Sequence, residues 1–143
     1  MRLSGKSVVD ANVILSALIG GKAIRVFIEA KELKFVTTDR VVGEVREYIP
    51  VLAKRKNLSR NVMEAVFSLL ELEVVEKEAY LQHVPKALEL IGRRDPDDAD
   101  LVALALALNC PVWTNDNDLV ELKEIKTLTT AEILCLVDSW ENG

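Results

Sequence analysis

The chain has 143 residues, half of them apolar and 29% charged, a composition typical of a soluble globular domain rather than of a disordered or fibrous protein. We expect one domain over residues 1–143, because a chain of this length buries about two-thirds of the surface that its unfolded form exposes. The net charge of -5 argues against broad, nonspecific duplex binding, which needs clustered Lys and Arg. A nucleic-acid substrate is not excluded, since divalent metal in an acidic site presents positive charge to phosphate.

Strand and helix signals alternate in the first half of the chain. They predict a strand at residues 7–10, a helix at 12–19 that stops at two glycines, a helix at 23–31 and a strand at 34–37. Valines and Ile49 then recur at helical spacing until Pro50 interrupts the pattern. A basic stretch at residues 54–56 precedes a helix that Ser59 caps and that runs to residue 70.

The alternation continues in the second half. We predict a strand at residues 73–76, a helix at 79–91 that Pro85 bends or divides, an apolar helix at 96–109, and strands at 111–114 and 126–128. Thr129 and Glu132 form a capping-box signature for a final helix that runs through Trp140. The sequence has no internal repeat and no dividing linker. It therefore predicts a three-layer α/β/α sandwich around a mostly parallel central sheet.

Cysteine, histidine and hydropathy exclude several classes of protein. Cys110 and Cys135 stand in apolar contexts without metal-site spacing, so we interpret both as buried thiols. His83 is the only histidine and is interpreted as structural, which leaves no Ser-His-Asp or Cys-His-Asn triad. The longest apolar run is far shorter than the roughly 20 residues of a membrane span, and the N-terminus lacks a secretory signal. We expect a cytoplasmic protein that does not contact a membrane.

Acidic residues stand at the edges of the apolar segments. Asp10 and Asp116 follow predicted strands, and Asp98 opens the apolar helix. Open α/β sheets place their ligand sites at the carboxyl ends of the strands, so these three side chains are predicted to face one crevice. Carboxylate oxygens suit hard cations such as Mg²⁺, and several carboxylates brought together are unfavourable unless a cation binds them. This pattern favours phosphoryl-transfer chemistry.

Each acid also has a purely structural interpretation. Asp10 can cap the following helix, although Asn12 can serve there as well. The Asp-Pro-Asp-Asp segment ending at Asp98 is a good helix start. Asp116 and Asp118 fit a turn built on side-chain hydrogen bonds, and the spacing around them fails the EF-hand pattern.

Four segments together resemble the PIN-domain ribonuclease family, in particular VapC-type toxins. They are Val-Val-Asp-Ala-Asn-Val-Ile ending at residue 14, Thr-Asp-Arg-Val-Val-Gly-Glu ending at Glu44, Asp-Asp-Ala-Asp-Leu-Val-Ala-Leu-Ala ending at residue 105, and Val-Trp-Thr-Asn-Asp-Asn-Asp-Leu ending at residue 119. The resemblance runs over nearly the full length, and the order and spacing of the segments are fairly specific. It implies a single PIN-like nuclease domain.

The resemblance also assigns site residues. It implies that Asp10, Glu44, Asp98 and Asp116 form an acidic quartet that binds Mg²⁺ or Mn²⁺. Glu44 enters through the family alone, since in the sequence it is an ordinary helix residue that can pair with Arg40 or Tyr48. Four residues would support the quartet. Asn12 and Thr114 would orient the acids, and Asp118 would assist or replace Asp116. Asp97 is a supporting residue that competes with Asp98 for the third position, as does Asp100.

The implied activity is hydrolysis of RNA phosphodiester bonds by a metal-activated water, as the toxin of a toxin-antitoxin pair. The implied partners are an RNA substrate, an antitoxin protein and a second copy of the chain. The homodimer is also suggested by the apolar helices around residues 41–70. The alternative is a PIN-like RNA- or protein-binding scaffold without catalytic activity.

Overall fold

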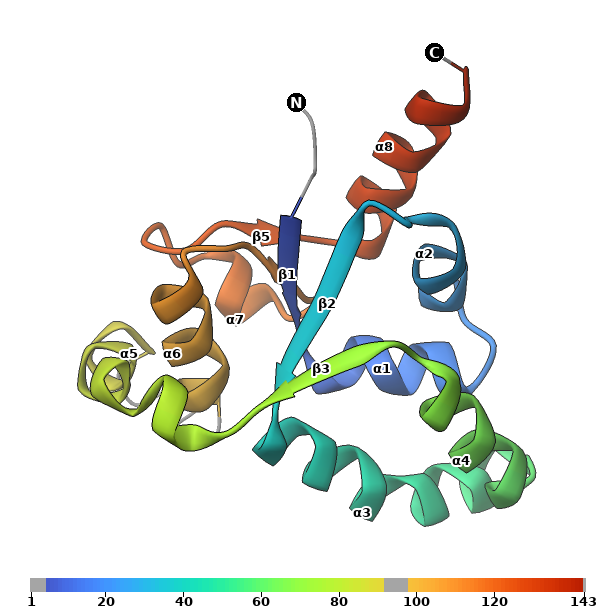
Figure 1. Cartoon of the computed structure of the whole chain (residues 1–143). Helices are drawn as coiled ribbons and strands as arrows, with labels where there is room; N and C mark the ends of the chain where they lie inside the picture. The colour runs from blue at the N-terminus through green and yellow to red at the C-terminus, as the bar shows by residue number, and fades with distance from the viewer. Residues whose placement is uncertain (1–4, 92–97, 143) are drawn as a thin grey trace.

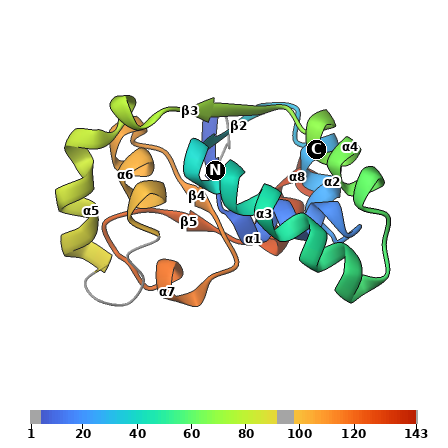
Figure 2. The ribbon, with the colours of Figure 1, turned by 90° about the horizontal axis from the view of Figure 1, so that it is seen from below.

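The central element is a five-stranded sheet in which every neighbouring pair of strands is parallel. The computed structural model describes residues 5–91 and 98–142. The strand order is β3-β2-β1-β4-β5, with β4 labelled in Figure 2 and the other strands in Figure 1. The strands are β1 (Gly5–Val9), β2 (Leu33–Thr38), β3 (Leu72–Val75), β4 (Val112–Trp113) and β5 (Thr127–Leu128). The predicted parallel sheet is confirmed.

Helices cover both faces of this sheet, as Figure 2 shows, and this confirms the three-layer α/β/α prediction. One face carries α1 (Ala11–Leu18), α2 (Ala23–Glu29), α3 (Asp39–Lys56), α4 (Arg60–Leu69) and α8 (Thr130–Asn142). The other carries α5 (Val84–Ile91), α6 (Ala99–Leu108) and the short α7 (Asn117–Val120). Two 3-10 turns, η1 (Lys77–Ala79) and η2 (Leu81–His83), lead from β3 into α5.

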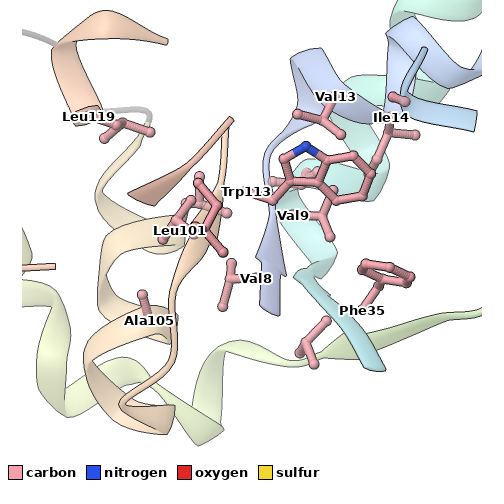
Figure 3. Close-up of a cluster of buried hydrophobic side chains, with 14 of the residues drawn as sticks. Val8, Val9, Val13, Ile14, Phe35, Leu101, Ala105, Trp113 and Leu119 are labelled. Carbon is pink, nitrogen blue, oxygen red and sulfur yellow. The ribbon is translucent and has the colours of Figure 1, made fainter. Parts of the chain in front are cut away.

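The hydrophobic core lies on both sides of β1. Figure 3 shows Leu101 and Ala105 from α6 on one side and Val13 and Ile14 from α1 on the other. Trp113 of β4 is fully buried, and its ring centroid lies within 5.5 Å of those of Phe27 and Phe35. Every residue from 99 to 105 is buried, as expected for a helix that is apolar nearly all round. The core thus holds β1 between α6 on one face of the sheet and α1 on the other.

Helix α3 contradicts the prediction that Pro50 ends it. It continues through Pro50 to Lys56 and ends at Asn57, which has a left-handed backbone with φ 54°. A proline inside a helix costs about 3 kcal/mol, because it removes a hydrogen bond and clashes with the preceding turn. Burial of Ile49 and Leu52 on either side of Pro50 opposes that cost. The predicted basic stretch is the last turn of α3, where cations interact favourably with the helix dipole.

The predicted helix caps are confirmed. Ser59 Oγ accepts a hydrogen bond from the backbone N of Val62 at 3.3 Å. At the start of α8, Thr129 Oγ1 accepts from Glu132 N at 3.2 Å and Thr129 N donates to Glu132 Oε1 at 3.1 Å. These are the two reciprocal bonds of a capping box. The segment at 79–91 is divided, as Pro85 suggested, with Pro85 in the first turn of α5.

The two cysteines differ from the prediction and from each other. Cys135 is exposed, because it lies on the outer face of α8, so the prediction of a buried thiol was wrong there. Cys110 is partly buried, and that burial raises the pKa of its thiol. Within residues 5–91 and 98–142, no single helix is both long and apolar enough to cross a membrane, and only α1 with α2, bent by 91°, would pass as a pair.

Candidate metal centre

The site lies at the point where the order in which strands are added to the sheet reverses. From β1 the chain adds β2 and then β3 on one side, whereas β4 and β5 lie on the other side of β1. Open α/β sheets form a crevice at the carboxyl ends of the two strands that flank such a switch point. Those strands are β1 (Figure 1) and β4 (Figure 2). Asp10 directly follows β1, and Asp116 lies three residues beyond β4.

Asp10 links the end of β1 to the start of α1. Its backbone N donates to the carbonyl oxygen of Trp113 at 3.0 Å, which continues the pairing of β1 with β4. Its Oδ1 accepts from Ala11 N at 2.7 Å, so the carboxylate caps α1. The helix-cap interpretation of Asp10 is therefore confirmed, and its geometry is compatible with the proposed site role of the same side chain. Asp10 is only 7% exposed, which fixes its carboxylate within the crevice.

Thr114 connects two of the acids. Its Oγ1 donates to Asp10 Oδ2 at 2.7 Å and accepts from Asp116 N at 3.0 Å. The Thr114 side chain is fully buried, and its bond to Asp10 is shielded from water. Asn12 Nδ2 donates to the same Oδ2 of Asp10 at 3.3 Å. The hydroxyl of Thr114 thus sets both the orientation of the Asp10 carboxylate and the backbone position of Asp116.

Three carboxylates meet at this crevice. Asp10, Asp98 and Asp116 each offer one oxygen, and these oxygens all lie within 4.8 Å of one another. Asp98 arrives from the other layer, because it stands immediately before α6. Asp98 and Asp116 are partly buried. The three predicted acids that end or begin elements at this edge are therefore brought together.

The donor set fits a hard divalent cation. Two oxygens bound to one Mg²⁺ lie at most about 4.2 Å apart, since each Mg–O distance is about 2.1 Å, so small side-chain shifts close the observed cluster around an ion. Asp10 accepts hydrogen bonds from Ala11 N, Asn12 Nδ2 and Thr114 Oγ1, and these bonds restrain its carboxylate oxygens. Three close negative charges also repel one another unless a cation or proton is present.

The remaining predicted residues are placed differently. Glu44 lies on α3, is exposed, and its Oε1 is 3.6 Å from Nε of Arg40, so it is not in the three-carboxylate cluster. Asp118 lies in α7, but its side chain is outside the described part of the structure, as is all of Asp97. Asp100, the competitor of Asp98, is buried and receives a hydrogen bond from Tyr80 at 2.9 Å.

The sequence analysis missed Tyr80. Its side chain is fully buried between η1 and η2, and its hydroxyl lies 2.9 Å from Asp100 Oδ2 and 3.4 Å from Asp39 Oδ1. Burial and the neighbouring Asp100 carboxylate raise the pKa of Tyr80 above its ordinary value, so the hydroxyl keeps its proton and donates it. The sequence around Tyr80 has no periodicity that would indicate this contact.

Comparisons with known proteins agree with this architecture. The PIN domain family model matches residues 8–136. No curated protein sequence matches the chain. Among solved structures, PAE2754 from Pyrobaculum aerophilum is 15% identical with a TM-score of 0.68, over 96% of this chain and 99% of that one. VapBC2 from Rickettsia felis, solved bound to a DNA fragment from its promoter, is 17% identical with a TM-score of 0.65, over 87% and 98%.

A third similar structure is VapC20 from Mycobacterium tuberculosis, described as a sarcin-ricin loop cleaving toxin. It is 19% identical with a TM-score of 0.53, over 83% of this chain and 98% of that one. At these identities the solved structures support the fold. The family model covers most of the chain, from the last residues of β1 into α8. This chain therefore belongs to the PIN-domain family.

Proposed function

We propose that this chain is a Mg²⁺- or Mn²⁺-dependent ribonuclease that hydrolyses RNA phosphodiester bonds, and that it is the toxin of a toxin-antitoxin pair. The observation that carries the proposal is the cluster of Asp10, Asp98 and Asp116, whose oxygens lie within 4.8 Å of one another. PIN-family membership and the likeness to VapC-type structures support it.

The chain's own residues would hold and orient the ion. A divalent ion at such a site lowers the pKa of a bound water and stabilises negative charge on a phosphate. Thr114 and Asn12 restrain the Asp10 carboxylate, and Thr114 also restrains the backbone of Asp116. Glu44, in the same proposal, is a fourth ligand that leaves its pairing with Arg40 when metal and substrate are bound. The single histidine, His83, has no part in the proposed chemistry.

The test is RNA cleavage by the purified chain with Mn²⁺, before and after chelation. Asp98→Asn removes one ligand charge without removing a helix-cap bond, because the Asp98 side chain makes none to the start of α6. Glu64→Gln on α4 is the matched control, since it makes the same change of charge at an exposed position. We expect cleavage by the wild type and by the control, and loss of cleavage with Asp98→Asn or chelator.

Each other outcome has a definite meaning. Cleavage by the purified chain that persists in chelator or in Asp98→Asn would refute the metal-dependent mechanism. Titration calorimetry with Mn²⁺ then separates the alternative function. A folded wild type that neither binds Mn²⁺ nor cleaves RNA would favour the noncatalytic scaffold.

An apolar groove supports the proposed antitoxin partner. It lies between α4 and the α1-α2 pair, has a volume of about 1440 Å³, and is lined by side chains such as Phe27, Met63 and Val66. Exposed apolar residues stand along it, among them Ile28 at 64%, Val62 at 59% and Leu69 at 79%. Exposed apolar surface of this kind is typical of interaction sites. We infer that an amphipathic segment of the antitoxin lies there.

Co-expression with the product of an adjoining short gene tests this partner. Val62→Asp introduces a charge into the groove, and Val51→Asp is the matched control, because Val51 is 47% exposed on α3 and lies outside the groove. We expect Val62→Asp to abolish co-purification and Val51→Asp to preserve it. Light scattering of the chain alone tests the predicted homodimer. A dimer that Val62→Asp converts to monomer would assign the groove to a second copy instead.

A further inference from the structure

A buried polar contact joins Tyr80 to Asp100, two residues after Asp98 of the carboxylate cluster. Tyr80 is among the largest fully buried side chains, and its hydroxyl donates to Asp100 Oδ2 at 2.9 Å, with Asp39 Oδ1 at 3.4 Å as a weaker second acceptor. Asp100 is itself only 6% exposed. Asp39 Oδ1 also accepts from Arg40 N at 2.9 Å. The phenol therefore joins the η1-η2 segment to the first turns of two different helices.

Both of those helices carry proposed metal ligands. Asp100 lies in the first turn of α6, two residues after Asp98, and Asp39 is the first residue of α3, which carries Glu44. The Asp100 carboxylate points to Tyr80 and is not part of the cluster of Asp10, Asp98 and Asp116. The contact thus acts on the elements that bear the ligands rather than on a ligand itself.

Apolar packing alone does not fix the place of α6 along its axis. The helix is buried through Leu101, Val102, Ala103 and Leu104, and such contacts are non-directional. A hydrogen bond to an ionised carboxylate depends on distance and angle, so it restrains the first turn much more tightly. An apolar pair of the same volume in place of Tyr80 and Asp100 would avoid burying a charge and would often be as stable. A role in positioning explains why the polar pair is present.

We propose that Tyr80 is a positioning residue of the metal centre: its hydroxyl holds the first turn of α6, through Asp100, where Asp98 reaches Asp10 and Asp116. This inference rests on the metal site of the proposed function. Groups that hydrogen-bond directly to a metal ligand typically change metal affinity about 10- to 100-fold when they are replaced. Tyr80 bonds Asp100 rather than a proposed ligand, so we expect an effect at the lower end of that range.

The test compares Mn²⁺ affinity, thermal stability and crystal structures of full-length variants. Tyr80→Phe removes only the hydroxyl. Tyr48→Phe is the matched control, because the hydroxyl of Tyr48, on α3, bonds to exposed Arg55. We expect Tyr80→Phe to raise the Mn²⁺ dissociation constant about 10-fold, the lower end of the range for residues that orient metal ligands, and Tyr48→Phe to leave it unchanged. In metal-free crystals of Tyr80→Phe, we expect the oxygens of Asp10, Asp98 and Asp116 no longer to lie within 4.8 Å of one another.

Two further variants separate positioning from stability. Asp100→Asn keeps an oxygen that can accept from Tyr80 but removes the charge, so we expect it to lose less Mn²⁺ affinity than Tyr80→Phe does, and a larger loss would contradict the role of the Tyr80 hydroxyl. The double variant Tyr80→Phe/Asp100→Leu removes the unpaired buried carboxylate, so we expect it to recover thermal stability but not Mn²⁺ affinity. Recovery of both thermal stability and Mn²⁺ affinity in the double variant would overturn the proposal. A Tyr80→Phe protein that is less stable than the wild type but binds Mn²⁺ equally tightly would also overturn it.

The crystal structures keep this inference distinct from the proposed function. If the wild type binds no Mn²⁺, the metal site fails, and the position of Asp98 in Tyr80→Phe still decides the role of Tyr80. A displaced Asp98 would support the positioning role, and an unmoved Asp98 would overturn it. If the wild type binds Mn²⁺, the dissociation constants and the geometry must change together.

Discussion

Replacing Thr114 with Val tests whether the carboxylate cluster depends on one buried hydroxyl. The substitution keeps the branched shape but removes the donor to Asp10 Oδ2 at 2.7 Å and the acceptor for Asp116 N at 3.0 Å. Thr37→Val is a closely matched control. Thr37 is also fully buried, and its hydroxyl donates at 2.8 Å to the carbonyl oxygen of Val9 instead of to a carboxylate.

The two substitutions should differ in their cost to stability. A hydrogen bond to a charged group contributes about 1.5 to 3 kcal/mol and a neutral one about 1 kcal/mol. The Thr114 hydroxyl makes one bond of each kind, so Thr114→Val should lower the free energy of unfolding by about 3 kcal/mol. Thr37→Val should lower it by about 1 kcal/mol. At about 2 to 4 °C per kcal/mol, the melting temperatures should fall by about 9 °C and 3 °C.

Metal affinity should distinguish the two variants more clearly. Loss of a group that orients a ligand weakens metal binding about 10- to 100-fold, and only Thr114 contacts a proposed ligand. Titration calorimetry with Mn²⁺, on protein first treated with chelator, measures this difference below both melting temperatures. The reasoning would be refuted by a Thr114→Val protein that loses stability but keeps wild-type affinity. Equal loss of affinity in both variants would also refute it, because the effect would then be general.

Three other predictions concern α3 and the cysteines. Glu44→Gln should weaken Mn²⁺ binding measured by calorimetry. It should change the free energy of unfolding by less than about 0.5 kcal/mol, because Glu44 is exposed. Equal Mn²⁺ affinity in Glu44→Gln and in the control Glu47→Gln would show that Glu44 is not a ligand. Pro50→Ala should raise the free energy of unfolding in urea by about 1 to 2 kcal/mol, since it restores a helical N–H, and a loss of stability would contradict this. At pH 8, exposed Cys135 should react with a disulfide reagent much faster than Cys110. The thiolate is the reactive form, and burial raises the pKa of the Cys110 thiol. A single reaction rate for both cysteines would contradict this prediction.

The sequence indicates the part of the site that strand ends determine. Asp10 directly follows an apolar strand, and Asp116 follows Thr114 after another, so a parallel sheet places both at one edge. Asp98 is indicated in the same way, because it precedes an unusually apolar helix that has to pack on the sheet. Local pattern and global fold agree at these three positions, which is why reasoning from the sequence succeeds there.

The rest depends on contacts that no local pattern encodes. Glu44 is exposed on α3, and its sequence context is that of an ordinary helix residue, so only the family resemblance indicated it. The bond of Tyr80 to Asp100 joins a 3-10 segment to a helix 20 residues away. The continuation of α3 through Pro50 is likewise decided by burial of Ile49 and Leu52 rather than by propensity.

The carboxylate cluster lowers the stability of the metal-free chain, and the hydrogen bonds of Thr114 and Tyr80 both hold the cluster together against this effect. Three carboxylates with oxygens within 4.8 Å repel one another, so the relaxed arrangement would let Asp98 or Asp116 move away. Thr114, the residue after β4, opposes that movement through its bond to Asp116 N, and Tyr80 opposes it through its bond to Asp100 in the first turn of α6. Metal that binds only the folded chain stabilises it by about 2.7 kcal/mol at 100 times its dissociation constant. Variants that loosen either restraint should therefore show a smaller Mn²⁺-induced rise in melting temperature than the wild type at the same Mn²⁺ concentration.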